Sequence, residues 1–161
     1  NLPYNISTEI LTKWIINLGS KVWFEKLVLM FQKEVADRII SNHNSSNYGR
    51  LSIISNWRLS AKKIIDIKPN SFKPIPKVES TLLVFEPKKN YFKLKSSQSI
   101  EKITKIFFNQ RRKKIKRPMK VLFNNSDKIA EKLNIDLNLR PQNLDFETYY
   151  RIADEFEKLN K

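Results

Sequence analysis

The chain opens with a tetrapeptide whose residue types suit the binding of an exocyclic amine. In Asn1-Leu2-Pro3-Tyr4, the Asn1 side-chain oxygen and a backbone carbonyl beside Pro3 can each accept a hydrogen bond from an –NH2 group. The Tyr4 ring can stack on the flat heterocycle that carries this amine. Because so short a motif also occurs as a simple turn before a helix, the rest of the chain has to decide between the two interpretations.

The charge of the chain favours a polyanionic partner. The 161 residues carry a net charge of +15, which suits RNA, DNA or an anionic lipid surface. Seven of the ten residues in 111–120 (RRKKIKRPMK) are basic. The alternative is a solvated helix face whose cations pair with the helix dipole. We favour phosphate contact, because so many neighbouring like charges repel one another unless a polyanion offsets them.

Several classes of protein are disfavoured by what the sequence lacks. It has no cysteine and one histidine, His43, so we expect no metal site. It has no apolar run of about 18 residues and no signal-peptide pattern, so we expect no membrane association and a cytosolic protein. Its two glycines, Gly19 and Gly49, do not form the glycine-rich turn that cradles a nucleotide.

The elements that would position the opening motif alternate between helix and strand up to about residue 88. We expect a helix that is capped by Ser7 or Thr8 and stops at Gly19, strands at 24–31, 63–67 and 81–85, and a helix at 33–41. The segment 50–57 is ambiguous between helix and strand, and we favour a helix. The last two strands could form an antiparallel pair. Beyond residue 99 the periodicity is helical only, with helices expected at 100–109, 114–123, 127–133 and 144–159.

Four segments in a fixed order resemble the rRNA adenine N6-dimethyltransferase family. They are 1–8 (NLPYNIST), 48–52 (YGRLS), 72–80 (FKPIPKVES) and 108–113 (FNQRRK), and the resemblance extends from Asn1 to about Ala153. Leu2, 48–52 and 107–113 resemble the members that act on small-subunit rRNA more than the erythromycin-resistance type, which acts on large-subunit rRNA.

The resemblance implies an α/β fold, with the C-terminal part of a Rossmann-like S-adenosylmethionine-dependent methyltransferase domain followed by a small all-α domain. It implies residues 1–88 for the catalytic part, 89–99 for a linker and 100–161 for a helical RNA-binding domain. The glycine-rich loop, the acidic ribose-binding residue and the first strands of the family have no counterpart in this sequence. We therefore expect a fragment that binds S-adenosylmethionine weakly or not at all and is inactive alone. Its apolar strand at 27–31 would lack a neighbour and favour self-association.

The activity implied is N6,N6-dimethylation of two adjacent adenosines near the 3′ end of small-subunit rRNA. The methyl donor is S-adenosylmethionine, and the partner is small-subunit rRNA or the pre-30S particle in the cytoplasm. By resemblance, Asn1 and the carbonyl near Pro3 hold the adenine amine, and Asn1 also borders the S-adenosylmethionine site. Tyr4 would stack on the flipped base and Phe72 would close its other face, at about 1–3 kcal/mol per stacked base.

The residues expected to bind RNA are Arg111, Arg112, Lys113, Lys114, Lys116, Arg117, Lys77 and Arg50. Each has a plainer alternative. Phe72 could be a core residue that anchors the proline-rich loop, Arg50 could form a salt bridge, and Lys77 could be a solvated loop lysine. Two other functions also remain open for the chain as a whole. They are a non-catalytic RNA- or DNA-binding module and a large-subunit rRNA methyltransferase.

Overall fold

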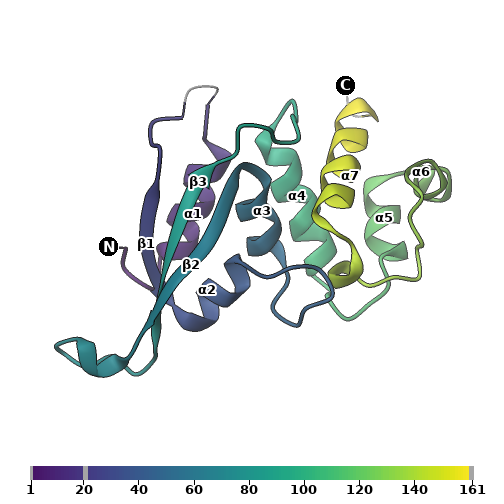
Figure 1. Ribbon diagram of the computed structural model, residues 1–161. Helices are drawn as coiled ribbons and strands as arrows, with labels where there is room; N and C mark the ends of the chain where they lie inside the picture. The colour runs from purple at the N-terminus through teal and green to yellow at the C-terminus, as the bar shows by residue number, and fades with distance from the viewer. Residues whose placement is uncertain (1, 20–21, 160–161) are drawn as a thin grey trace.

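The first half of the molecule is built around a three-stranded sheet (Figure 1). The computed structural model describes residues 2–19 and 22–159. Its strands are β1 (Leu27–Gln32), β2 (Leu59–Ile67) and β3 (Ser80–Pro87), in the order β1-β3-β2. The central strand β3 runs antiparallel to both neighbours, which confirms the antiparallel pairing predicted for the last two strands.

One face of the sheet is buried under helices. Leu29 and Phe31 of β1 and Leu83 and Phe85 of β3 are buried, whereas Val28 is exposed. This alternation is the period-two pattern of a sheet with one covered face. Three helices belong to this half: α1 (Ser7–Ile16), α2 (Lys33–Ile39) and α3 (Arg50–Arg58). Helices α2 and α3 pack on the strands, and α1 packs on α3.

The second half is helical, as predicted. It contains α4 (Ser97–Phe108), α5 (Lys116–Leu122), α6 (Ser126–Leu133) and α7 (Phe146–Leu159). A short 3-10 helix, η2 (Pro141–Asn143), precedes α7, and another, η1 (Pro69–Ser71), follows β2 in the first half. Helices α4 and α7 pack on each other and on α3. The Glu157 carboxylate of α7 accepts hydrogen bonds from the backbone N–H groups of Lys95, at 2.8 Å, and Ser96, at 2.9 Å. These bonds fix the approach of the chain to α4.

Direct contacts tie the two halves together. The Tyr150 hydroxyl of α7 donates to the Ile53 carbonyl of α3 at 3.2 Å, and Trp57 Nε1 donates to the Phe92 carbonyl at 2.8 Å. The buried apolar side chains of both halves belong to one cluster. The predicted division into a catalytic part (1–88), a linker (89–99) and a helical domain (100–161) stays a prediction, because a core shared by both halves is compatible with one domain or with two.

The element ends differ from the sequence predictions in places. Helix α1 ends at Ile16 and not at Gly19, because the Leu18 side chain turns back into the core, where it is 8% exposed. Ser7 lies inside α1, where its hydroxyl donates to the Tyr4 carbonyl at 3.1 Å. Strand β1 begins at Leu27, three residues after the predicted start, because Phe24 packs edge-on against Trp23 instead of joining the sheet.

Candidate functional site

The opening tetrapeptide forms a turn that is anchored to the sheet. The backbone N–H of Ile6 donates to the Pro3 carbonyl at 3.2 Å. Tyr4 is partly buried, and its hydroxyl lies 2.6 Å from the Ser80 hydroxyl, a hydrogen bond in which either group can donate. Asn1, the predicted amine acceptor, lies outside the described residues. The Pro3 carbonyl can accept a second hydrogen bond, because an amide oxygen has two lone pairs.

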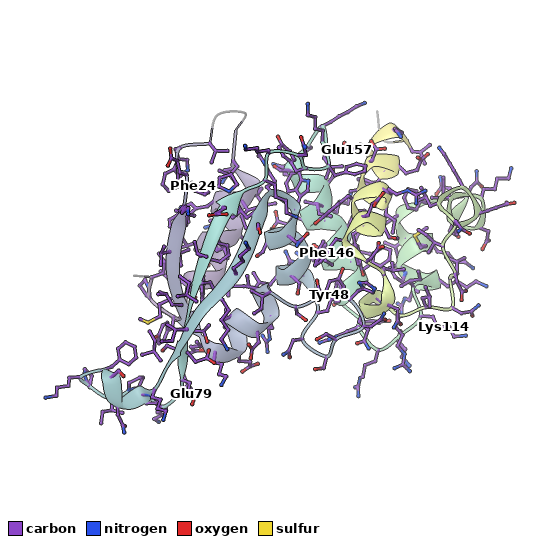
Figure 2. The ribbon with its side chains drawn as sticks, in the orientation of Figure 1. Phe24, Tyr48, Glu79, Lys114, Phe146 and Glu157 are labelled. Carbon is purple, nitrogen blue, oxygen red and sulfur yellow. The ribbon has the colours of Figure 1, made fainter. Side chains whose placement is uncertain are left out.

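The first residues of β3 connect three other elements at one point. The Lys33 backbone N–H donates to the Glu79 carbonyl at 2.9 Å, and Lys33 Nζ donates to the Glu79 carboxylate at 2.7 Å. The Thr81 hydroxyl donates to Asp66 Oδ1 at 2.6 Å, while Tyr4 binds Ser80. Figure 2 shows Glu79 at this end of the sheet. The turn at Tyr4, the start of α2 and the end of β2 are therefore all fixed to β3.

The charges at this point stabilise one another. The hydrogen bond to Glu79 and the carboxylate charges of Glu79 and Asp66 raise the pKa of Lys33. Hydrogen bonds from Lys63 and Thr81 lower the pKa of Asp66. A cavity of about 370 Å³ lies next to this cluster, with Gln32, Lys33 and Glu79 among the residues that line it. The motif 72–80 therefore lines this cavity through Val78 and Glu79, and it contacts the motif 1–8 at the neighbouring residue, Ser80.

Phe72 and Lys77 lie in the segment between η1 and β3, which projects past the ends of the strands (Figure 1). Phe72 is half-buried and Lys77 is exposed. Among the described residues, Phe72 makes no ring contact with Tyr4. Two rings that enclose a base would not touch each other, so stacking by Phe72 stays a prediction.

A larger cavity, of about 710 Å³, lies between α1, the start of α3 and the loop before it. It is lined by cations from four different elements, Lys13, Arg38, Arg50 and Arg111, together with the carboxylates of Glu9 and Glu101. Its charged side chains therefore carry a net charge of +2, four cations less two carboxylates. Two of the predicted RNA-binding residues, Arg50 and Arg111, are thus brought to one concave surface. The salt-bridge alternative for Arg50 is present, because its guanidinium lies 3.5 Å from Glu101.

The segment 48–52 owes its residue types to packing. Tyr48 is fully buried and makes edge-on ring contacts with Phe146 and Phe108 (Figure 2). Gly49 precedes α3, and its N–H donates to the Ser52 hydroxyl at 3.1 Å. Burial raises the pKa of Tyr48, and its hydroxyl has no hydrogen-bond partner within the described residues.

The basic run divides into residues that bind the protein and residues that do not. The Arg111 guanidinium donates to the backbone carbonyls of Ser45 and Ser46. Lys114 Nζ donates to Asn138 at 2.9 Å, and Arg117 donates to Gln110 at 3.4 Å. The remaining predicted residues of the run are exposed and make no side-chain hydrogen bond or ion pair with the described part of the chain; they are Arg112, Lys113 and Lys116.

The positions of Lys116 and Arg117 argue against pairing with the dipole of α5, whereas Lys120 lies in its last turn, where the dipole favours a cation. The residues 111–114 lie in the loop between α4 and α5, and Lys116 and Arg117 occupy the first turn of α5. The predicted helix at 114–123 therefore begins two residues late. The N-terminal end of a helix carries a partial positive charge, so cations there gain nothing from the dipole.

Sequence reasoning missed several residues that the structure brings to these sites. Ser80 belongs to the motif 72–80, but the sequence assigned it no function, and its hydrogen-bond partner Tyr4 is 76 residues away in the chain. Arg38 lines the larger cavity from α2 and pairs with Glu34. No local spacing connects these residues to the opening motif, so only the tertiary structure could have found them.

The described residues include no glycine-rich turn of the kind that cradles a nucleoside cofactor. Gly19 and Gly49 both have φ outside the left-handed region, and neither belongs to a glycine-rich turn. In residues 2–19 and 22–159, no three His, Asp or Glu side chains are grouped to hold a metal ion. Of the helices in these same ranges, none is long and apolar enough to cross a membrane.

The likeness to solved structures gives the class of the molecule, a Rossmann-like methyltransferase fold, of which this chain has three strands and the helices that pack on them. A crystal structure of a dimethyladenosine transferase from Plasmodium falciparum superposes on 99% of this chain with a TM-score of 0.79 and 25% identity, and 66% of that chain is covered. A 23S rRNA methyltransferase, ErmE, has a TM-score of 0.62 over 99% of this chain and 63% of its own, at 17% identity. The second likeness concerns the fold alone.

Sequence similarity then gives the family. The family model described as ribosomal RNA adenine dimethylase matches residues 1–158. The chain is 64% identical over 159 residues to a protein from Pelagibacter ubique (strain HTCC1062), and 45% identical over 160 residues to one from Ehrlichia ruminantium (strain Gardel). Both are named ribosomal RNA small subunit methyltransferase A. The chain belongs to the ribosomal RNA adenine dimethylase family.

The chain spans only part of the length of these relatives. The two alignments include 99% and 96% of this chain but 61% and 58% of the respective relatives. The resemblance seen in the four motifs is thus confirmed at the level of the family.

Proposed function

We propose that the protein containing this chain is an S-adenosylmethionine-dependent rRNA (adenine-N6,N6)-dimethyltransferase. Its substrate would be two adjacent adenosines near the 3′ end of small-subunit rRNA, in the rRNA or the pre-30S particle in the cytoplasm. The observation that carries the proposal is the 2.6 Å hydrogen bond between Tyr4 and Ser80, which joins the motifs 1–8 and 72–80. The identity of 64% to a ribosomal RNA small subunit methyltransferase A supports the choice of substrate.

In the proposed reaction, the opening motif would bind the target adenine. An adenine amine is a weak nucleophile, because its lone pair is delocalised into the ring. Acceptors at Asn1 and near Pro3 would favour a more pyramidal nitrogen, and the Tyr4 ring would hold the base by stacking. S-adenosylmethionine, when bound, would supply a methyl group on a positively charged sulfur, and the residues of the opening motif would hold the adenine amine that receives it.

The basic surfaces would hold the RNA backbone. Arg112, Lys113 and Lys116 are exposed and unpaired within the described residues, so phosphates can reach them without breaking a protein contact. The cavity lined by Arg38, Arg50 and Arg111 offers a second positive surface. Phosphate contacts of this kind position an RNA, and the clamp at Tyr4 would select the base.

The test is methylation of small-subunit particles that lack the two dimethylated adenosines. We expect the full-length protein to produce N6,N6-dimethyladenosine in small-subunit rRNA, detected by mass spectrometry of nucleosides. Asn1→Ala should abolish the product and retain RNA binding, whereas the control Asn17→Ala, at an exposed asparagine after α1, should behave as wild type. Unchanged methylation by Asn1→Ala would contradict the catalytic assignment.

The same assay distinguishes the alternatives. RNA binding without any methylation by the wild-type protein would favour a non-catalytic RNA- or DNA-binding module, which the unpaired basic residues also suit. Methylation of large-subunit rRNA would favour the erythromycin-resistance type. We also expect the 161-residue chain by itself to be inactive, because its described residues include no glycine-rich turn that could cradle S-adenosylmethionine. Micromolar binding of S-adenosylmethionine by calorimetry would contradict this expectation.

The sheet edges support a further expectation, self-association of the isolated chain. Strand β1 (LVLMFQ) lies at one edge with no charge and no proline. The other edge strand, β2, carries Lys62 and Lys63 and has an irregular register between Lys63 and Ile65, both of which discourage strand addition. Light scattering should detect dimers of the chain at high concentration, and a monomer throughout would contradict the expectation.

A further inference from the structure

The Ser80 hydroxyl occupies a rigid position at the end of the central strand. Ser80 is fully buried, and it is the first residue of β3, opposite Gln32 of β1 and Ile67 of β2. Its two neighbours are also held, Glu79 by Lys33 and Thr81 by Asp66. A hydroxyl that is fixed on both sides in this way has little freedom to move.

Tyr4, by contrast, belongs to a short turn whose ring is held at one end. Its backbone carbonyl accepts from the Ser7 hydroxyl at 3.1 Å, and its own hydroxyl bonds Ser80 at 2.6 Å. The ring is only partly buried, so part of its surface stays accessible. The hydrogen bond to Ser80 is the one side-chain polar contact of Tyr4 within the described residues.

We propose that Ser80 is a positioning residue that fixes the hydroxyl end of the Tyr4 ring and so the direction of its long axis, and that this matters most for the second methyl transfer to each adenosine. The inference rests on the proposed function. Ser80 does not touch the substrate in this scheme. It fixes the ring on which the target base stacks, and it acts only through the Tyr4 hydroxyl.

The two transfers differ in how firmly the base is held. An unmodified adenine amine has two N–H bonds and can donate to two acceptors, whereas a monomethylated amine has one. The second transfer therefore begins with one hydrogen bond fewer at the amine. Stacking on Tyr4 then supplies a larger share of the orientation, so a ring that tilts should impair the second transfer more than the first.

The experiment compares the ratio of N6-monomethyladenosine to N6,N6-dimethyladenosine at equal total methyl incorporation. The full-length protein acts on small-subunit particles that lack the modification, and mass spectrometry of nucleosides gives the ratio. Ser80→Ala and Tyr4→Phe each remove the hydrogen bond from one side, and Tyr4→Phe keeps the ring. We expect each to raise the ratio about two- to tenfold, the range that follows from the net free energy of one hydrogen bond.

A double variant tests whether Ser80 acts through Tyr4. Tyr4→Phe combined with Ser80→Ala should raise the ratio no further than either single change, because both remove the same bond. Ser55→Ala is the matched control, since Ser55 is another fully buried serine, whose hydroxyl has no partner within the described residues. It should leave the ratio unchanged. A general loss of stability would slow both transfers without accumulating the monomethyl product.

The remaining outcomes separate this inference from the proposed function. A wild-type protein that forms no methylated adenosine would refute the function itself. Normal dimethylation by wild type with an unchanged ratio in Tyr4→Phe would overturn the inference alone, even if Ser80→Ala failed to fold. Additive effects in the double variant would overturn it as well, because Ser80 would then act by another route.

Discussion

The clearest quantitative prediction concerns the three unpaired cations of the basic run. Arg112, Lys113 and Lys116 are exposed and make no side-chain contact with a polar partner in the described part of the chain. Changing all three to Gln should therefore remove phosphate contacts without loss of protein contacts. Unfolding midpoints in urea should stay the same, because substitutions of exposed, unpaired residues alter stability little.

The size of the effect follows from counterion release. Each phosphate contact contributes about 0.7 to 0.9 to the slope of log affinity against log salt, so three contacts contribute about 2 to 3. Between about 50 and 200 mM salt, the affinity of the wild type for RNA should fall by a factor that is roughly 20 to 40 times larger than the factor for the triple variant. Fluorescence anisotropy with a labelled RNA from the 3′ end of small-subunit rRNA measures both slopes.

A control variant with the same change in charge decides whether the location matters. Lys89, Lys93 and Lys128 are exposed lysines outside the run, and they too have no polar partner among the described residues. Their triple change to Gln should leave most of the slope intact. Equal slopes for the two triple variants would refute the reasoning, because the net charge and not the run would then determine binding.

Three further predictions concern the framework around the sites. Tyr48 and Tyr149 are both fully buried, but within the described residues only the Tyr149 hydroxyl has a hydrogen-bond partner, the Pro141 carbonyl at 2.7 Å. Tyr149→Phe should therefore lower the free energy of unfolding by about 1 kcal/mol, whereas Tyr48→Phe should leave it unchanged or raise it. Equal losses for the two variants in urea unfolding would contradict this. The pKa of Asp66 is lowered in the folded protein. The ionised carboxylate therefore stabilises the fold at pH values above its unfolded pKa, and this stabilisation is lost as the pH falls through the folded pKa. The difference in unfolding free energy between wild type and Asp66→Asn should shrink from about pH 5 downward, and a difference that stays constant would argue against the cluster. Arg111→Gln should speed hydrogen exchange of the backbone amides in 42–49, because the Arg111 guanidinium binds the Ser45 and Ser46 carbonyls. The control Arg112→Gln should leave this exchange unchanged. Similar exchange rates in the two variants would exclude the anchoring role of Arg111.

Sequence patterns predicted the elements well where periodicity decides them. The strands and helices of both halves lie where the apolar spacing placed them, and α3, which was ambiguous, is helical. Element ends were less accurate, because they depend on tertiary contacts. Strand β2 begins at Leu59, four residues before the predicted start, since pairing with Glu86 and Pro87 extends it. Nothing in 59–62 (LSAK) alone favours a strand.

The candidate site shows the same limit more sharply, because its contacts are long-range. Tyr4 and Ser80 were both in quoted motifs, yet a sequence motif says which residues occur together and not which of their atoms meet. The basic run illustrates the opposite case. Its composition predicted a charged surface, but only the structure separates Arg111, which holds the Ser45 and Ser46 carbonyls, from Arg112, which is unpaired within the described residues. We therefore expect a substitution at the first to disturb the loop at 45–46 as well as any RNA contact, whereas one at the second tests the proposed RNA binding alone.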